Sequence, residues 1–147
     1  MSKLVEMTGL EIMTAVKDGT LPRAPIAEVL DFDLTKVSEG FCRFEGDLKP
    51  SYENPMGTIH GGYTATLLDS AMACAVMAAL PKGASYTTLE IKVNYVKGFT
   101  GQDGRVAAEG KTIHVGRRTA TAEGHLYNEA GKLLAHGTTT CIVFPPA

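Results

Sequence analysis

Cysteine is scarce in this sequence of 147 residues. The three cysteines, Cys42, Cys74 and Cys141, stand far apart. An odd number of widely spaced cysteines fits neither a disulfide framework nor the paired CxxC arrangement of a metal site. The start of the chain also lacks the positive and then apolar pattern of a secretory signal. We therefore expect a cytoplasmic protein with reduced cysteines.

An excess of positive charge is absent as well. The formal net charge is -2 and the isoelectric point is near 6.1. This balance disfavours a broad nucleic-acid surface, although a local basic cluster could still contact an anionic group. His114, His125 and His136 stand on separate segments without ligand spacing, so the sequence predicts no metal site.

No hydrophobic run free of charge is long enough to cross a membrane. Residues 61–80 have about the 20-residue length of a spanning helix, but Asp69 stands near their centre. A carboxylate at that depth costs roughly 2.5–3.5 kcal/mol on insertion. The segment therefore predicts a buried central helix in a soluble protein, with no membrane partner.

The length of the chain suits one domain over residues 1–147, with residues 1–25 forming an N-terminal helix and linker. Thr8 and Glu11 have the spacing of a capping box, and apolar residues then recur at helical spacing as far as Gly19. Residues 26–32 fit either a single helical turn or an irregular strand.

The rest of the chain is rich in β-strand signals. Alternating residues on either side of Gly40 predict a hairpin over residues 32–45. Four further strands are predicted at residues 86–95, 104–115, 118–128 and 132–144. The last two connections are short and favour antiparallel pairing. Together with the long helix, these strands indicate an α+β fold in which a sheet wraps around one helix.

The segment Asn54-Pro55-Met56-Gly57-Thr58-Ile59-His60-Gly61-Gly62 leads directly into the predicted helix. Helix N-termini present unpaired N–H groups and a partial positive charge. Gly61 and Gly62 carry no side chain that would keep a ligand oxygen away from those donors. The segment is therefore a candidate binding and reaction site.

Asp69 is the second candidate, since an acid in an apolar helix is costly to bury in its charged form. It follows Gly61 by eight residues, so a straight helix separates the two by about 12 Å along its axis. If both act on one small group, they must come from two subunits related by a two-fold axis. The alternative is a purely structural acid that pairs with a neighbouring hydroxyl or N–H group.

The pattern Asn54-Pro55-x-Gly57-x-x-His60-Gly61-Gly62 followed by Asp69 resembles the hotdog-fold acyl-CoA thioesterases of the phenylacetate-pathway and mammalian thioesterase-superfamily type. The resemblance extends from about residue 26 to residue 144. It implies a five- or six-stranded antiparallel sheet around the central helix, a homodimer formed by joining sheet edges, and commonly a homotetramer. The implied substrate is an acyl-CoA, with coenzyme A as part of the substrate and no separate cofactor.

The resemblance also implies roles for single residues. The Gly61 N–H would donate to the thioester carbonyl, where negative charge grows and one donor contributes roughly 3–4 kcal/mol. Asp69 of the partner subunit would act as general base or nucleophile. Asn54 would orient the water or the carbonyl rather than only cap its turn, and Thr88 would hold Asp69 or the water. His60 is expected to brace the loop rather than to transfer protons.

A further set of residues is expected to bind the substrate: Gly57, Gly62, Tyr63, Gly116, Arg117 and Arg118. The two arginines follow a turn, where guanidinium groups can reach the phosphates of coenzyme A, although a solvated turn charge is the plain alternative. Tyr63 departs from the small or aliphatic residues that are frequent in the family, and Asp31 stands where glycine is common. Cys74 is expected to pack in the core, because no histidine stands near it in sequence.

Two other functions remain open from the sequence. A hotdog dehydratase or hydratase would use a catalytic histidine together with the acid on the helix. A non-catalytic acyl-CoA sensor would keep the pocket and lack the acid, so the presence of Asp69 argues against it. The sequence does not specify whether the acyl group is aryl, medium-chain or long-chain.

Overall fold

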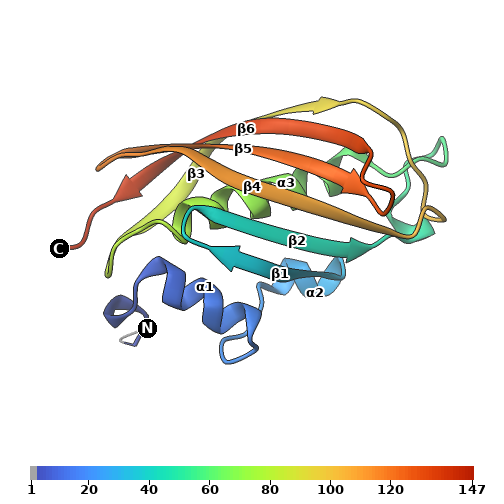
Figure 1. The fold of residues 1–147 in the computed structure, drawn as a ribbon. Helices are drawn as coiled ribbons and strands as arrows, with labels where there is room; N and C mark the ends of the chain where they lie inside the picture. Colours follow the sequence, from blue (N-terminus) through green and yellow to red (C-terminus); the bar gives the residue numbers. More distant parts are fainter. Residues whose placement is uncertain (1–2) are drawn as a thin grey trace.

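The computed structural model describes residues 3–147 and begins with three short helices (Figure 1). These are the 3-10 helix η1 (Leu4–Glu6), α1 (Gly9–Lys17) and α2 (Pro25–Val29). The Thr8 side chain accepts a hydrogen bond from the Glu11 N–H, and the Glu11 carboxylate accepts one from the Thr8 N–H. The predicted capping box is thus confirmed. Met1 and Ser2, the first residues of the predicted N-terminal segment, lie outside the described residues.

Six strands form one antiparallel sheet in the order β1-β2-β4-β5-β6-β3. They are β1 (Phe32–Ser38), β2 (Phe41–Asp47), β3 (Ser85–Tyr95), β4 (Arg105–Val115), β5 (Thr119–Asn128) and β6 (Leu133–Phe144). The predicted hairpin and the four later strands are confirmed. The chain adds β3 beside β6 rather than beside β2, so β1 and β3 are the two edges of the sheet.

Helix α3 (Gly61–Met77) lies along the inner face of the sheet (Figure 1), as the apolar run predicted. Leu67, Leu68 and Met72 are fully buried between helix and sheet. A Cβ atom at Gly110 of β4 would lie 2.2 Å from the Ala71 carbonyl oxygen. The helix backbone therefore approaches the sheet directly at this point, and only glycine leaves the space. This hotdog arrangement fixes the direction in which each side chain of α3 points.

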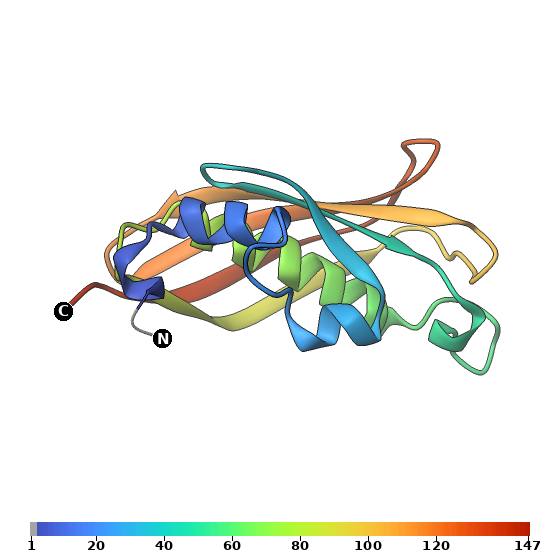
Figure 2. The same cartoon turned by 90° about the horizontal axis from the view of Figure 1, so that it is seen from below.

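The N-terminal helices cover the β1 edge of the sheet. Figure 2 shows α1 beside the C-terminal part of α3 and α2 nearer to its N-terminal part. Residues 26–32, for which the sequence left two possibilities, form the single turn of α2 and then the start of β1. Between them Asp31 has φ of 51°, a left-handed conformation that glycine adopts without strain and Asp tolerates. A hydrogen bond from Lys49 stabilises the Asp31 carboxylate and lowers its pKa.

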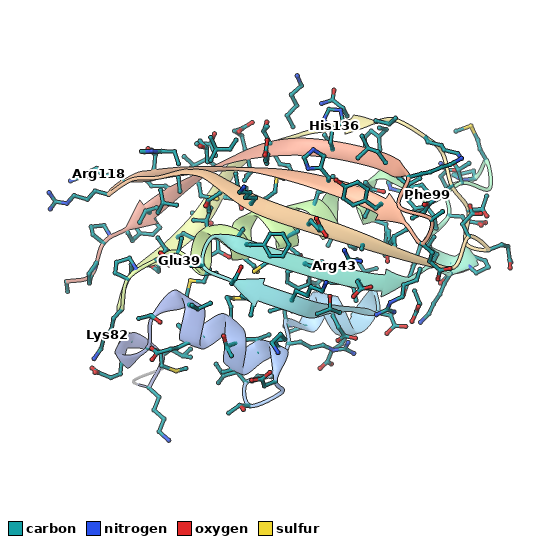
Figure 3. The ribbon with its side chains drawn as sticks, in the orientation of Figure 1. Glu39, Arg43, Lys82, Phe99, Arg118 and His136 are labelled. Atoms are coloured by element: carbon teal, nitrogen blue, oxygen red, sulfur yellow. The ribbon has the colours of Figure 1, made fainter. Side chains whose placement is uncertain are left out.

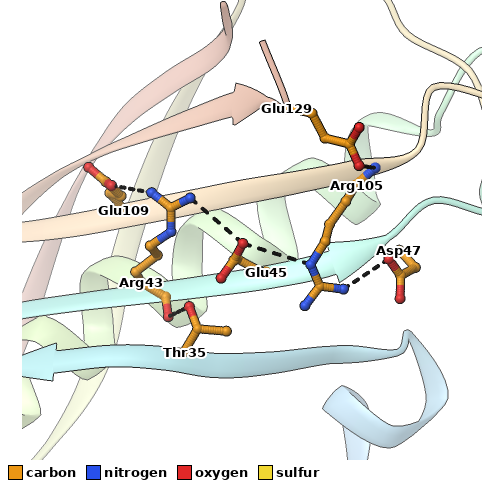
Figure 4. Close-up of polar contacts among 7 residues, drawn as sticks. All are labelled: Thr35, Arg43, Glu45, Asp47, Arg105, Glu109 and Glu129. Carbon is orange, nitrogen blue, oxygen red and sulfur yellow. Dashed lines mark hydrogen bonds and ion pairs between the residues drawn. The ribbon is translucent and has the colours of Figure 1, made fainter. Parts of the chain in front are cut away.

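The outer face of the sheet carries a ladder of charged side chains across β2 and β4 (Figure 4). Arg43 pairs with Glu109 at 2.6 Å, and Arg105 pairs with Asp47 at 2.9 Å. Glu45 lies between the two arginines at 3.7 Å from each. These positions alternate with the buried Cys42 and Phe44, as expected for strands with one face toward the core.

No helix within residues 3–147 is long and apolar enough to span a membrane.

Candidate functional site

The loop before α3 is organised by the side chain of Asn54. Its Oδ1 accepts hydrogen bonds from the N–H groups of Met56 at 2.9 Å and Thr58 at 3.3 Å. Its Nδ2 donates to the Thr58 hydroxyl at 2.9 Å. Gly57 stands at the tip with φ of 80°, as the turn requires. Within one protomer, Asn54 therefore has the turn-capping role that the sequence left open beside a catalytic one.

His60 is the N-cap of α3. Its Nδ1 accepts a hydrogen bond from the Gly62 N–H at 2.8 Å, and its own N–H donates to the Tyr52 carbonyl at 2.8 Å. This is the bracing position that was expected for His60. Gly61 is the first residue of the helix, so its N–H has no partner inside α3, and within residues 3–147 it donates to no side chain. The Gly61 N–H is thus left as a backbone donor at the N-terminus of α3, here called the helix entrance.

Tyr95, at the end of β3, packs on this entrance and was not expected from the sequence. Its hydroxyl donates to the Gly61 carbonyl at 2.7 Å. A Cβ atom at Gly61 would lie 2.9 Å from that hydroxyl oxygen, so a larger residue would displace the ring. The contact joins residues 34 positions apart. No local motif marks such a pair, and only the course of β3 past the helix brings the two together.

Asp69 lies half-buried on α3, facing β3. The Thr88 hydroxyl donates to Asp69 Oδ1 at 3.0 Å, which is one of the two contacts expected of Thr88, while its role in the reaction stays a prediction. Both side chains line an open depression of about 440 Å³. The other residues around it are Ser70, Ala73, Cys74, Tyr86 and Thr87. Asp69 therefore has one hydrogen-bonded oxygen and stands where a small molecule can reach it.

A β-bulge in β3 adjoins Thr88. The register against β6 shifts between Thr88 and Glu90, so that Leu89 is the extra residue. Thr139 of β6 is buried and donates its hydroxyl to the Glu90 carbonyl at 2.8 Å. Bulges redirect side chains and are frequent beside active sites. The pattern of strand residues did not predict this irregularity.

Cys74 lies beside Asp69 in the depression but is a poor nucleophile. Burial raises the pKa of its thiol to about 12, and the nearby Asp69 carboxylate acts in the same direction. The thiol therefore stays protonated at neutral pH. This agrees with the expectation that Cys74 is a packing residue.

The structure assembles the predicted catalytic residues as two separate groups. Asp69 and Thr88 form one, and Asn54, His60 and Gly61 form the other at the start of α3. Gly61 and Asp69 belong to the same helix, so the rise of α3 keeps them about 12 Å apart along its axis. A single protomer does not bring the two groups to one reacting atom.

The predicted phosphate-binding residues lie at the opposite end of the molecule from the loop. Gly116, Arg117 and Arg118 form the turn between β4 and β5, where the Gly116 N–H donates to the Thr119 carbonyl at 2.8 Å. Figure 3 shows Arg118 at one tip and Phe99, whose carbonyl accepts from the Ile59 N–H, at the other. Both arginines are exposed, and their role in binding stays a prediction.

Tyr63 lies in the core rather than in either site group. It is 4% exposed and stacks on Tyr52, with ring centroids 4.9 Å apart. Its hydroxyl has no hydrogen-bond partner within the described chain, and burial raises its pKa. Tyr63 does not line the Asp69 depression, so its predicted part in substrate binding stays a prediction.

Residues 3–147 contain no group of three or more His, Cys, Asp or Glu side chains that could hold a metal ion.

Comparison with known proteins gives a consistent family. The model of the Thioesterase superfamily matches residues 56–135, more than half of the chain. Acyl-coenzyme A thioesterase 13 from Homo sapiens is 29% identical over 109 residues, which cover 73% of this chain and 76% of the human protein. The 1,4-dihydroxy-2-naphthoyl-CoA hydrolase of Listeria monocytogenes is 25% identical over 118 residues, covering 80% and 94% of the two chains.

Solved structures agree with this. A mutant of the phenylacetic acid degradation protein PaaI from Thermus thermophilus superposes with a TM-score of 0.73 at 29% identity, covering 81% of this chain and 98% of that one. The family match covers the helix entrance, Asp69 and Thr88 together. The chain therefore belongs to the thioesterase superfamily, as a thioester hydrolase with the hotdog fold.

Proposed function

We propose that the chain is an acyl-CoA thioesterase that hydrolyses its substrate to a free acid and coenzyme A. The observation that carries this proposal is the Asp69 carboxylate, held by the Thr88 hydroxyl on the wall of an open depression. The names of the human and Listeria relatives, which specify a coenzyme A thioester, support the choice of substrate.

The chemistry needs a base and an oxyanion donor. Asp69 takes a proton from water as the water attacks the thioester carbon, or attacks that carbon itself. The Gly61 N–H of the partner subunit stabilises the negative oxygen of the tetrahedral state. Collapse of that state expels the coenzyme A thiolate. If Asp69 acts as base, the thiolate takes the proton that Asp69 removed from water. If Asp69 is the nucleophile, the thiolate takes a proton from solvent, and water then hydrolyses the mixed anhydride on Asp69 to release the free acid. Arg117 and Arg118 bind the phosphates of coenzyme A, and no other cofactor takes part.

The composite site requires a homodimer in which two α3 helices lie antiparallel. Strand β3 supports this arrangement, because it is a sheet edge with unpaired backbone groups and with Leu89 and Tyr95 exposed. Pairing of two β3 strands about a two-fold axis would extend the sheet and place each α3 beside the other. Two such dimers then form a homotetramer.

Mixing two inactive proteins tests the composite site. Asp69→Asn removes the base, and Gly61→Val displaces Tyr95 and disturbs the donor. Each variant alone should lose at least about 100-fold in kcat/KM, as expected for a group acting in the transition state. After equal amounts of the two are unfolded and refolded together, about half of the dimers are mixed and each mixed dimer has one intact site of two. The mixture as a whole should therefore regain about a quarter of the parent activity.

A thiol-release assay with acyl-CoA substrates measures this recovery, with Asp18→Asn on the exposed end of α1 as the matched control that keeps full activity. If mixed dimers form but no activity is recovered, the composite site is contradicted.

The dehydratase alternative is disfavoured by His60, because Nδ1 of its ring already accepts the Gly62 N–H. The sensor alternative is disfavoured by the hydrogen-bonded Asp69 carboxylate.

A further inference from the structure

A cavity of about 580 Å³ lies between α1, the linker before α2, strand β1 and helix α3. Figure 2 shows these helices side by side on this face of the molecule. The walls are largely apolar and include Met13, Val16, Leu21, Ala27, Phe32 and Leu34. Its inner end reaches Ser70 and Cys74 of α3.

The cavity adjoins the Asp69 depression at these two residues. Ser70 and Cys74 line both hollows, and Asp69 and Ala73 line the depression alongside them. Residues four apart lie on the same face of a helix. Asp69 and Ala73 therefore form one stripe along α3, and Ser70 and Cys74 form the stripe next to it. The Asp69 depression and the cavity therefore lie on either side of the Ser70 and Cys74 side chains.

We propose that this cavity holds the acyl chain of the substrate and that the chain is a flexible aliphatic one. The inference rests on the proposed thioesterase function, because it takes the thioester carbon to lie at Asp69. From that carbon the chain passes Ser70 and Cys74 and lies between α1 and α3.

The size of the cavity favours an aliphatic chain over a single aromatic ring. A cavity of about 150 Å³ is enough to hold benzene. The volume here is roughly four times as large and falls in the range of about 300–1,000 Å³ typical of small-molecule pockets. A lone ring would leave most of the walls without contacts, whereas an alkyl chain has the rotatable bonds to follow them.

The outer end of the cavity limits the length of the chain. Arg23 and Asp33 form an ion pair of 2.6 Å there, and Lys17 also lines the cavity. Extending an alkyl chain past these groups would desolvate them without offering hydrogen bonds in return. The structure thus assigns the N-terminal segment a part in selecting chains of medium length.

Filling the cavity tests the assignment. Ala27 of α2 is buried and lines the cavity, whereas Val29 on the same helix is 74% exposed and does not. Ala27→Leu should lower kcat/KM for dodecanoyl-CoA at least about tenfold and leave butanoyl-CoA within about twofold, because the short chain does not reach the new side chain. Val29→Leu should match the parent for both substrates. The parent should prefer dodecanoyl-CoA to phenylacetyl-CoA at least about tenfold.

A second variant, Val16→Phe, fills the cavity from α1 and should shift the chain-length profile of hydrolysis in the same direction. Melting temperatures show whether each variant folds.

Calorimetric binding of dodecanoyl-CoA to the Asp69→Asn protein separates the acyl-cavity proposal from the thioesterase proposal. Hydrolysis with the same chain-length profile in both filled variants and the control would overturn the acyl cavity and leave the thioesterase function standing. Binding that is weakened by Ala27→Leu without any hydrolysis by the parent would support the cavity and overturn the function. Preference for phenylacetyl-CoA would overturn the aliphatic assignment.

Discussion

Asp69 is a carboxylate in an otherwise apolar helix, and its single neighbouring donor decides what it can do. The Thr88 hydroxyl reaches Oδ1 at 3.0 Å, which leaves Oδ2 for water or substrate. A hydrogen bond to a charged group contributes roughly 1.5–3 kcal/mol and fixes the direction of the free oxygen. Thr88 is therefore a positioning residue in the proposed reaction.

Replacing Thr88 with valine keeps its shape and removes the donor. We expect kcat to fall about tenfold or more, since roughly 1.4 kcal/mol of transition-state stabilisation corresponds to a factor of ten. Thr88→Ser, which retains the hydroxyl, should recover most of the loss. Steady-state kinetics should place the change in kcat rather than KM, and equal losses in valine and serine variants would show that the hydroxyl is not involved.

The sequence predicted several of these residues and missed others for one reason. Asn54, His60 and Gly61 stand within a few positions of one another, so their spacing could be compared with a known motif. The Asp69–Thr88 contact was expected from the family resemblance, not from local spacing. Tyr95 belongs to no motif, and its contact with Gly61 depends on where β3 ends relative to α3. Such a contact follows only from the folded path of the strand.

At the scale of elements, the packing of α3 on β4 fixes the direction of Asp69. The close approach at Gly110 leaves no room for a side chain between strand and helix. The strands themselves were predictable from alternation, and α3 from its apolar length. The register of β3 and its bulge at Leu89 were not, because they depend on pairing with β6.

Gly110→Ala should therefore destabilise the whole molecule. The added methyl group would lie 2.2 Å from a backbone oxygen of α3, which cannot rotate away. Overpacking of this kind typically costs about 1–3 kcal/mol. Urea unfolding measures the loss. The matched control is Gly98→Ala, whose nearest neighbour would be a methyl carbon of Thr58 at 3.9 Å, and it should change stability by less than about 0.5 kcal/mol.

At the scale of the whole molecule, the free edge of β3 is the feature that bears on assembly. An exposed strand edge with apolar side chains is a template for pairing with another chain. Leu89 is 59% exposed in the protomer, so a charge there costs the isolated chain little. Its environment changes only when another subunit is present.

Leu89→Arg should accordingly give a folded protein with a lower molecular mass in solution and at least about tenfold less thioesterase activity, because like charges would face each other across the two-fold axis. Light scattering after size-exclusion chromatography reports the mass, and circular dichroism reports the fold. Val29→Arg on exposed α2 is the control and should keep both mass and activity. A monomeric Leu89→Arg protein with full activity would contradict the proposed assembly.

The separation of Gly61 and Asp69 by eight positions has a consequence for how activity depends on the amount of protein. In the proposed composite site, a single chain carries both the Gly61 donor and the Asp69 carboxylate, but it cannot bring the two to the same substrate. Below the dissociation constant of the dimer, the rate would then rise with the square of the protein concentration rather than in proportion to it. A cell that halved its supply of such a chain would lose three quarters of the hydrolysis, so the rise of one helix would act as a threshold on expression.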